Sequence, residues 1–372
     1  MGESITIIHT ADLHLGMQPE KDLPVGKERA REVAESLPRL VAACNEQEAD
    51  LLLIAGDLFH KAPLVRELKD VAYQFGKLAK TRVVMIAGNH DYISARSNYP
   101  AWIAANGYAP EDAAEGAQVT MFAGAETEKV YLPSLGTVVY GRSYHSQNVT
   151  EGIYDDIVPT EPGIRILLAH GGDPTDAPLD VKKIAGNGWD YVALGHIHKP
   201  GELAPGIVYP GSPEPLDRNE TGPHGYELVR ITVDDAGRRK TEATFVPFAK
   251  REYRDLEIAL TAETTAGSLA DAAAAAIAAD GGENLYRLIL TGRRDADFAP
   301  DKAALAAPGN VTEVVDRSLP EYDLEALRAA NADNLIGMFI DALAERAETD
   351  EVARKALYEG LTALLRQNTR GL

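Results

Sequence analysis

Residues 51–60 read LLLIAGDLFH, an unbroken apolar run followed at once by glycine, aspartate and histidine. Apolar residues that are continuous rather than alternating predict a strand covered on both faces of a sheet. Four other short runs have the same character, at residues 5–8, 83–87, 166–169 and 191–194. Together they indicate a layered α/β core.

Helical periodicity separates the first three runs. Residues 28–46 and 64–78 place apolar side chains on one face at helical spacing. Further strands are expected at residues 137–140 and 226–233. The chain therefore starts with strand, helix, strand, helix, strand, which favours sheets flanked by helices.

The character of the chain changes near residue 250. Strands at 255–260, 285–291 and 311–315, an alanine-rich helix at 268–279 capped by Ser268, and a short helix at 302–306 predict a small α+β domain. Two helices, at 323–347 and 351–365, are expected to follow. We therefore divide the chain into domains at 1–250 and 251–320 and a helical segment at 321–372.

Composition restricts the possible chemistry. The single cysteine, Cys44, excludes an intrachain disulfide and a cysteine-built metal site. The formal net charge of −20 argues against strong DNA binding by this chain alone, although bound cations or a basic partner can supply positive charge locally. The acidity also has a simpler explanation in solubility.

No apolar run approaches about 18 residues, so the sequence predicts no membrane span. Residues 1–10 lack a basic segment followed by a long apolar run, so we expect no signal peptide. The opening Met1-Gly2 matches a myristoylation pattern. We discount that pattern because residues 5–8 read as a core strand, and we expect a cytoplasmic protein.

Each of the five apolar runs is followed by residue types that bind hard metal ions. These residues are Asp12 and His14; Asp57; Asn89, next to His90 and Asp91; His170; and His196 and His198. Singly, each has an ordinary explanation as a turn, cap or surface residue. Their joint occurrence at strand ends predicts one shared site, because the carboxyl ends of sheet strands meet at a crevice.

The ligand types predict the metal class. Carboxylate, amide oxygen and imidazole suit manganese, iron or zinc. Two cations need a bridging carboxylate, and Asp57 is the best candidate because its motif is central in the order. In extended backbone, positions i and i+2 point to the same side, so Asp12 and His14 are expected to face the site together. Gly56, Gly88 and Gly195 allow close backbone approach.

These motifs resemble, in order, those of the calcineurin-like metallophosphoesterases. Residues 9–16 (HTADLHLG), 56–60 (GDLFH) and 195–200 (GHIHKP) are further similar to the SbcD family of DNA-repair exonucleases, with a weaker similarity at 209–213 (YPGSP). Protein phosphatases of the superfamily usually carry an arginine soon after the second motif. This chain has Lys61-Ala62-Pro63 there.

The resemblance implies hydrolysis of DNA phosphodiester bonds at two divalent metal ions, most simply manganese. It implies that the first metal is held by Asp12, His14, Asp57 and His198, and the second by Asp57, Asn89, His170 and His196. His90 would be the general acid or transition-state stabiliser, and His60 would help to position or protonate the substrate. Asp91 would orient His90, or it is a turn carboxylate.

The resemblance also implies partners. Residues 1–250 would be the nuclease domain and 251–320 a capping domain that selects DNA. The terminal helices either pack on the protein's own body or dock onto an SbcC-type ATPase. The family's nuclease subunit often forms a homodimer, to which residues 99–108 could contribute.

Two other functions remain open. A small phosphodiester or nucleotide could be the substrate, which the acidic charge favours. A non-enzymatic scaffold that binds metal and a partner is the third possibility.

Overall fold

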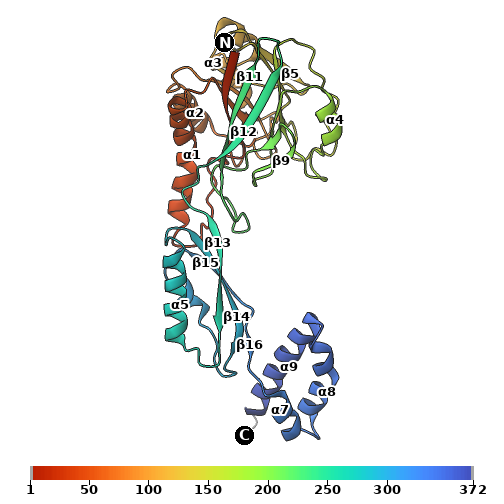
Figure 1. The fold of residues 1–372 in the computed structure, drawn as a ribbon. Helices are drawn as coiled ribbons and strands as arrows, with labels where there is room; N and C mark the ends of the chain where they lie inside the picture. The colour runs from red at the N-terminus through yellow and green to blue at the C-terminus, as the bar shows by residue number, and fades with distance from the viewer. Residues whose placement is uncertain (1–2, 370–372) are drawn as a thin grey trace. The chain divides into compact units, whose positions relative to one another are not determined.

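The computed structural model describes residues 3–369, which form two compact units divided after Tyr253 (Figure 1). Met1 and Gly2, which carry the myristoylation pattern, lie outside the described residues. Within residues 3–369, no helix is both long and apolar enough to cross a membrane. The finer division of residues 251–372 into capping domain and helical segment stays a prediction.

The first unit contains two six-stranded sheets. The first has the order β12-β11-β1-β2-β3-β4, with β1 (Glu3–Thr10), β2 (Leu51–Ala55), β3 (Arg82–Ile86), β4 (Val119–Met121), β11 (Gly225–Val233) and β12 (Arg239–Pro247). The second has the order β5-β6-β7-β8-β10-β9, with β5 (Glu128–Leu132), β6 (Thr137–Gly141), β7 (Ile164–His170), β8 (Tyr191–Gly195), β9 (Gly201–Ala204) and β10 (Ile207–Tyr209). In both sheets the central strands run parallel.

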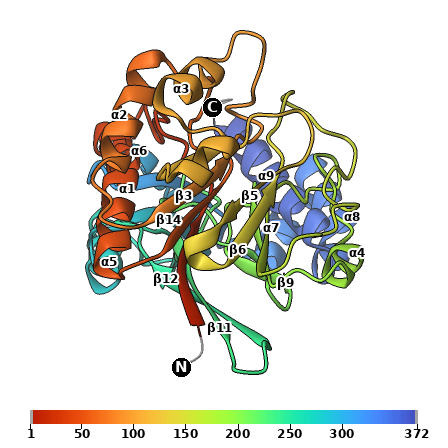
Figure 2. The ribbon, with the colours of Figure 1, turned by 90° about the horizontal axis from the view of Figure 1, so that it is seen from above.

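Helices cover the outer face of each sheet. They are α1 (Gly26–Glu46), α2 (Val65–Phe75), α3 (Tyr99–Asn106) and α4 (Val181–Gly186), with short 3-10 turns at Pro110–Glu115 and Pro133–Leu135. The first three lie together on one side in Figure 2 and share a buried cluster with the first sheet. A second cluster lies between the sheets, and a third joins α4 to the second sheet.

This layering explains the continuous apolar runs. In β2, Leu52 and Ile54 pack under the helices, while Leu51 and Leu53 pack against the second sheet. All four side chains are buried, and each such burial stabilises the fold by about 1.5–3 kcal/mol. The predicted α/β core of sheets flanked by helices is confirmed.

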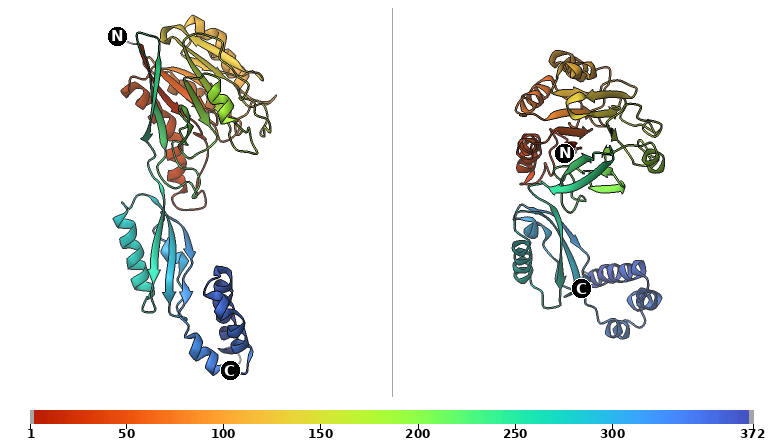
Figure 3. Two further views of the ribbon diagram at one scale, coloured as in Figure 1. Left: turned by 45° about the vertical axis from the view of Figure 1, so that its right-hand side comes forward. Right: turned by 45° about the horizontal axis from the view of Figure 1, so that its top comes forward.

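The second unit begins with a small sheet of order β13-β14-β15, with β16 paired to β14. Its elements are β13 (Tyr253–Leu260), α5 (Ala266–Ala279), β14 (Leu285–Arg294), α6 (Lys302–Ala306), β15 (Val311–Asp316) and β16 (Leu319–Pro320). Helix α5 runs along one face of the sheet (Figure 3), where Leu269 and Ala273 join its core. The predicted cap Ser268 is wrong: Thr265 is the N-cap, and Ser268 is its partner three residues later.

Three helices end the described chain: α7 (Leu324–Ala330), α8 (Leu335–Ala347) and α9 (Glu351–Thr369). The single helix expected at 323–347 is therefore wrong. Asn334 breaks it, because its side-chain oxygen accepts the N–H groups of Ile336 and Gly337 and starts a new helix. The three helices share a separate small apolar cluster.

Candidate metal centre

The seven residues predicted as ligands converge at the carboxyl ends of strands from both sheets. Asp12, His14, Asp57 and Asn89 follow β1, β2 and β3, whereas His170 ends β7 and both His196 and His198 follow β8. Donor atoms of Asp12, His14 and His198 lie within 4.8 Å of one another, as do those of Asp12, Asp57 and His170. Asn89 joins them, with its Oδ1 2.9 Å from Nε2 of His170 and 3.3 Å from Nδ1 of His196.

Asp57 lies in the middle of this set. Its Oδ2 is 3.5 Å from Nε2 of His14 and 3.6 Å from Nε2 of His170. Its Oδ1 accepts the backbone N–H of His90 at 2.9 Å, which fixes the rotation of the carboxylate. One oxygen of Asp57 therefore faces histidines of both predicted ligand sets, as a bridging carboxylate must.

The surroundings of Asp57 disfavour its charge. Burial raises the pKa of Asp57 well above its usual range, and repulsion from Asp91 and Asp12 adds to the effect. Burial also raises the pKa of Asp12 to about 7. Carboxylates buried together in this way are stabilised by nearby cations.

The protonation of the His170 ring indicates whether the donor set fits a cation. Its Nδ1 lies 2.8 Å from the carbonyl oxygen of Ala55, which can only accept, so Nδ1 carries a proton. Burial, followed by repulsion from His196, holds the pKa of His170 well below its usual value. The ring is therefore neutral, and Nε2 presents a lone pair toward Asn89 Oδ1 and Asp57 Oδ2. A divalent cation fits such a convergence of acceptors.

The backbone at the site is held in an unusual conformation. Asp12, His14, Asp57 and His196 have positive φ angles of 55°, 46°, 49° and 93°. The expectation that Asp12 and His14 share a side through extended backbone is therefore wrong; left-handed turns aim them at the site instead. Non-glycine residues adopt such angles at a cost of about 1–3 kcal/mol, and they cluster at functional sites.

Glycines allow the close packing around Asp57. A Cβ on Gly88 would lie 2.3 Å from Asp57 Oδ1, and one on Gly56 would lie 2.3 Å from Nδ1 of His170. Gly195 is equally crowded, since its Cβ would lie 1.9 Å from the carbonyl oxygen of Ala55. The predicted close backbone approach at the three glycines is confirmed.

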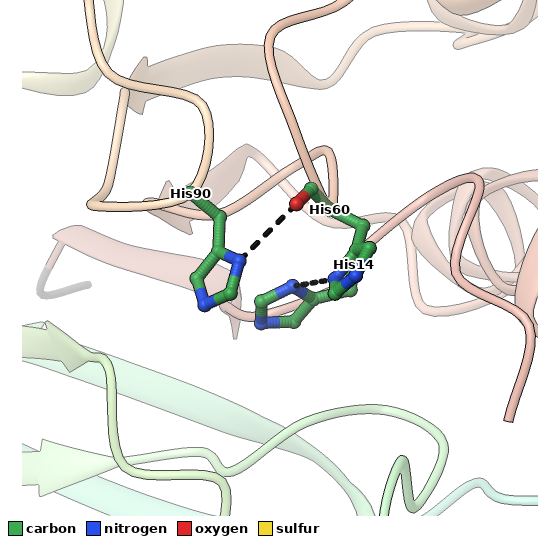
Figure 4. Close-up of side chains that lie close together, drawn as sticks. All are labelled: His14, His60 and His90. Atoms are coloured by element: carbon green, nitrogen blue, oxygen red, sulfur yellow. Dashed lines mark hydrogen bonds between the residues drawn. The ribbon is translucent and has the colours of Figure 1, made fainter. Parts of the chain in front are cut away.

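His60 and His90 form the outer rim of the site beside His14 (Figure 4). The Nδ1 of His90 lies 3.1 Å from the carbonyl oxygen of His60, and the two rings stack with centroids 5.2 Å apart. His90 is exposed, whereas His14 is buried beneath it. Burial and then repulsion from His90 lower the pKa of His60.

Asp91 holds the loop that carries His90. Its Oδ1 accepts the N–H of Gly88 at 2.9 Å, and its Oδ2 accepts the N–H of Phe59 at 3.1 Å and the hydroxyl of Tyr99 at 2.7 Å. The ring of His90 itself is oriented by the carbonyl of His60.

Glu220 also lies at the site, although no sequence motif predicted it. Its Oε1 lies 2.7 Å from Nδ1 of His198. Burial lowers the pKa of His198, but the hydrogen bond to Glu220 and attraction to Asp12 outweigh it and raise the pKa. The similarity at residues 209–213 pointed to this part of the chain, but not to Glu220.

The match to a known family agrees with this arrangement. The sequence pattern of the calcineurin-like phosphoesterases matches residues 5–200, which include all seven predicted ligands. The uncharacterized metallophosphoesterase YhaO of Bacillus subtilis (strain 168) is 30% identical over 256 residues, covering 62% of this chain and 58% of YhaO. The chain thus matches less than two thirds of that relative's length. The crystal structure of TT1561 of Thermus thermophilus aligns at 12% identity with a TM-score of 0.36, covering 64% of this chain and 98% of TT1561.

Proposed function

This chain belongs to the calcineurin-like phosphoesterase family, a family of metal-dependent hydrolases, and we propose that it is a two-metal phosphodiesterase that degrades DNA from its ends. The observation that carries the proposal is the position of Asp57. Its Oδ2 faces His14 on one side and His170 on the other, so one carboxylate joins two groups of donors. Paired cations that act on phosphate esters need such a bridge.

The residues present would hold two ions. The first set is Asp12, His14, Asp57 and His198, and the second is Asp57, Asn89, His170 and His196. When bound, the ions would activate water and offset the charge that develops on the phosphate oxygens. We propose manganese as the native metal, with iron and zinc compatible with the same donors.

We propose His90 as the proton donor. Because its Nδ1 donates to the carbonyl of His60, Nε2 is the atom left to hold a proton toward the leaving oxygen. His60 stacks against that ring, and we propose that it also contacts a phosphate oxygen of the substrate. A histidine in this role suits a reaction near neutral pH.

Two features bear on the substrate. His90 is exposed and His60 half-buried, so the rim of the site can meet a phosphate that belongs to a long polymer. The net charge of −20 favours the alternative, a small phosphodiester or nucleotide, because a polyanion is repelled by an acidic chain.

Turnover of two substrates separates these functions. Manganese-dependent hydrolysis of linear duplex DNA and of bis(4-nitrophenyl) phosphate would be measured, with Asp57→Ala as the inactive control. Activity on both substrates supports the nuclease, and activity on the small ester alone supports the alternative. Activity on neither substrate supports a metal-binding scaffold.

We also propose a partner. Leu335, Met338 and Val352 on α8 and α9 are 64%, 66% and 78% exposed, which suits docking of these helices on the coiled coil of an SbcC-type ATPase in the cytoplasm. A homodimer is the other assembly we propose. In α3, the side chains of Tyr99, Trp102 and Ile103 are buried in the unit's own core. Contacts of α3 with a second copy would therefore come from the other residues of this helix. Light scattering of the chain alone and with the ATPase tests both assemblies.

A further inference from the structure

One carboxylate outside the predicted ligand set touches a ligand directly. Glu220 Oε1 lies 2.7 Å from Nδ1 of His198, whereas the opposite ring nitrogen, Nε2, faces Nε2 of His14 at 3.2 Å. We propose, on the basis of the two-metal function, that Glu220 is a positioning residue for the metal centre. It holds the proton of His198 on Nδ1, so that Nε2 keeps its lone pair for a metal ion.

Glu220 is itself fixed by a closed ring of contacts. Its Oε2 accepts the N–H of Leu216 at 2.7 Å, and its carbonyl oxygen lies 3.2 Å from Nε2 of His224. Nδ1 of His224 lies 2.9 Å from the hydroxyl of Ser212. The N–H of Ser212 in turn donates to the carbonyl of His198 at 3.0 Å, so the series of contacts closes at His198.

The segment that carries Glu220 is built against the site. Gly211 has a φ of +72°, and a Cβ there would lie 2.5 Å from the carbonyl oxygen of His198. Arg218 pairs with Glu20 at 3.2 Å, which ties the segment to the loop after β1. Residues 209–224 lie beyond the family match at 5–200, so the metal centre extends past the motifs that define the family.

The chemistry of the two partners requires a carboxylate. Both the N–H of Leu216 and the Nδ1–H of His198 are donors, and a carboxylate can accept from both. Glutamine has the same shape but only one acceptor oxygen. If that oxygen accepts from Leu216, its NH₂ group faces Nδ1, and the ring proton must move to Nε2, where it blocks metal binding. In the opposite orientation the NH₂ group meets the N–H of Leu216, which puts two donors in contact. Glu220→Gln therefore disturbs either the tautomer of His198 or the anchoring of residue 220, with little change in shape.

Metal titration tests the role of Glu220. Calorimetry would follow manganese binding to chelator-treated wild type, Glu220→Gln and a matched control, Glu202→Gln. Glu202 also accepts a backbone N–H four residues away, from Gly206, at 2.9 Å. We expect Glu220→Gln to weaken one of two manganese sites by about 10–100-fold, with the control unchanged. Equal binding by all three proteins overturns the proposal. Absence of binding by the wild type instead contradicts the proposed function.

The wild-type protein alone gives a second test, which does not depend on the folding of a variant. Metal-free protein labelled with ¹⁵N-histidine reports, at a pH where the ring is neutral, which nitrogen of His198 carries the proton. We expect a protonated Nδ1 and an unprotonated Nε2. A proton on Nε2 in the metal-free protein would show that Glu220 does not set the tautomer.

Discussion

The Nε2 atoms of His14 and His198 lie 3.2 Å apart, although 184 positions separate the two residues in the chain. Burial, and then repulsion from His198 and other histidines, holds the pKa of His14 well below its usual value. The same Nε2 of His14 also faces Oδ2 of Asp57 at 3.5 Å. An imidazole lone pair that meets a second imidazole and a carboxylate is stabilised by a cation between them. The fold therefore brings together donors that could hold a cation, not only a cluster of histidines.

Replacing the central carboxylate should remove both ions. Asp57→Ala deletes the one oxygen that faces both His14 and His170. We expect manganese content, measured by mass spectrometry after dialysis, to fall from two per chain to near zero, and phosphodiesterase activity to fall to background. An Asp57→Ala protein with full metal content and activity defeats the assignment.

Replacing His90 should separate chemistry from metal binding. His90→Ala removes the ring held by the carbonyl of His60 but none of the seven predicted ligands. We expect two bound manganese ions and a kcat reduced by about 10²–10⁴-fold. His145→Ala is the control, because His145 is exposed and outside the histidine cluster. Wild-type kcat in His90→Ala would exclude the proposed proton transfer.

The crowding at Gly88 predicts a site that tolerates no Cβ. In Gly88→Ala the new carbon would lie 2.3 Å from Asp57 Oδ1 and 2.7 Å from Cε1 of His170, so the carboxylate must move. We expect at least tenfold weaker manganese binding and a loss of about 1–3 kcal/mol in the free energy of unfolding. Gly186→Ala, which meets open space in α4, should leave manganese binding unchanged and should not lower the free energy of unfolding, because alanine suits a helix better than glycine does. Calorimetry and urea denaturation of both variants check this, and unchanged binding by Gly88→Ala would mean that the packing is looser than described.

Glu227 should make stability depend on pH. It is 6% exposed, and burial, followed by repulsion from Glu202, raises its pKa to about 7. The folded state therefore holds this proton more tightly than the unfolded chain. The contribution of this proton to the free energy of unfolding is fully present below the unfolded pKa of about 4.5 and is lost as pH rises through 7. The glutamine in Glu227→Gln cannot ionise. The free energy of unfolding of this variant, relative to that of the wild type, should therefore rise by about 1–3 kcal/mol between pH 4.5 and 8.

Thermal denaturation of both proteins across that pH range checks this prediction. An exposed control, Glu345→Gln, should follow the wild type at every pH. A constant difference between Glu227→Gln and wild type would show that the Glu227 carboxyl does not titrate in this range.

Much of the fold followed from local patterns. Runs such as residues 51–55 are apolar on both sides because helices cover one face and a second sheet covers the other. The division of the five strands between two sheets could not be predicted, since periodicity reports burial and not which strands pair. The break at Asn334 was missed because a capping side chain within a helical pattern looks like an exposed helix residue.

The residues of the site could be predicted from the sequence, but the backbone conformation that positions them could not. Hard-metal ligands at the ends of five apolar runs suffice to propose that they meet. The left-handed angles of Asp12 and Asp57 arise from tertiary packing, which local propensity does not encode. Glu220 was missed for a similar reason, because its contact with His198 spans 22 positions, which include β9, β10 and the irregular segment after them.

We propose that the convergent donors bind two metal ions bridged by Asp57. Anomalous diffraction at the manganese edge, from crystals of the wild-type protein grown with manganese, would locate these ions. We predict two peaks about 3.5–4 Å apart, one beside His14 and His198 and one beside Asn89 and His170, with Asp57 reaching both. A site with no peak, or a single peak out of reach of Asp57, would contradict the claim.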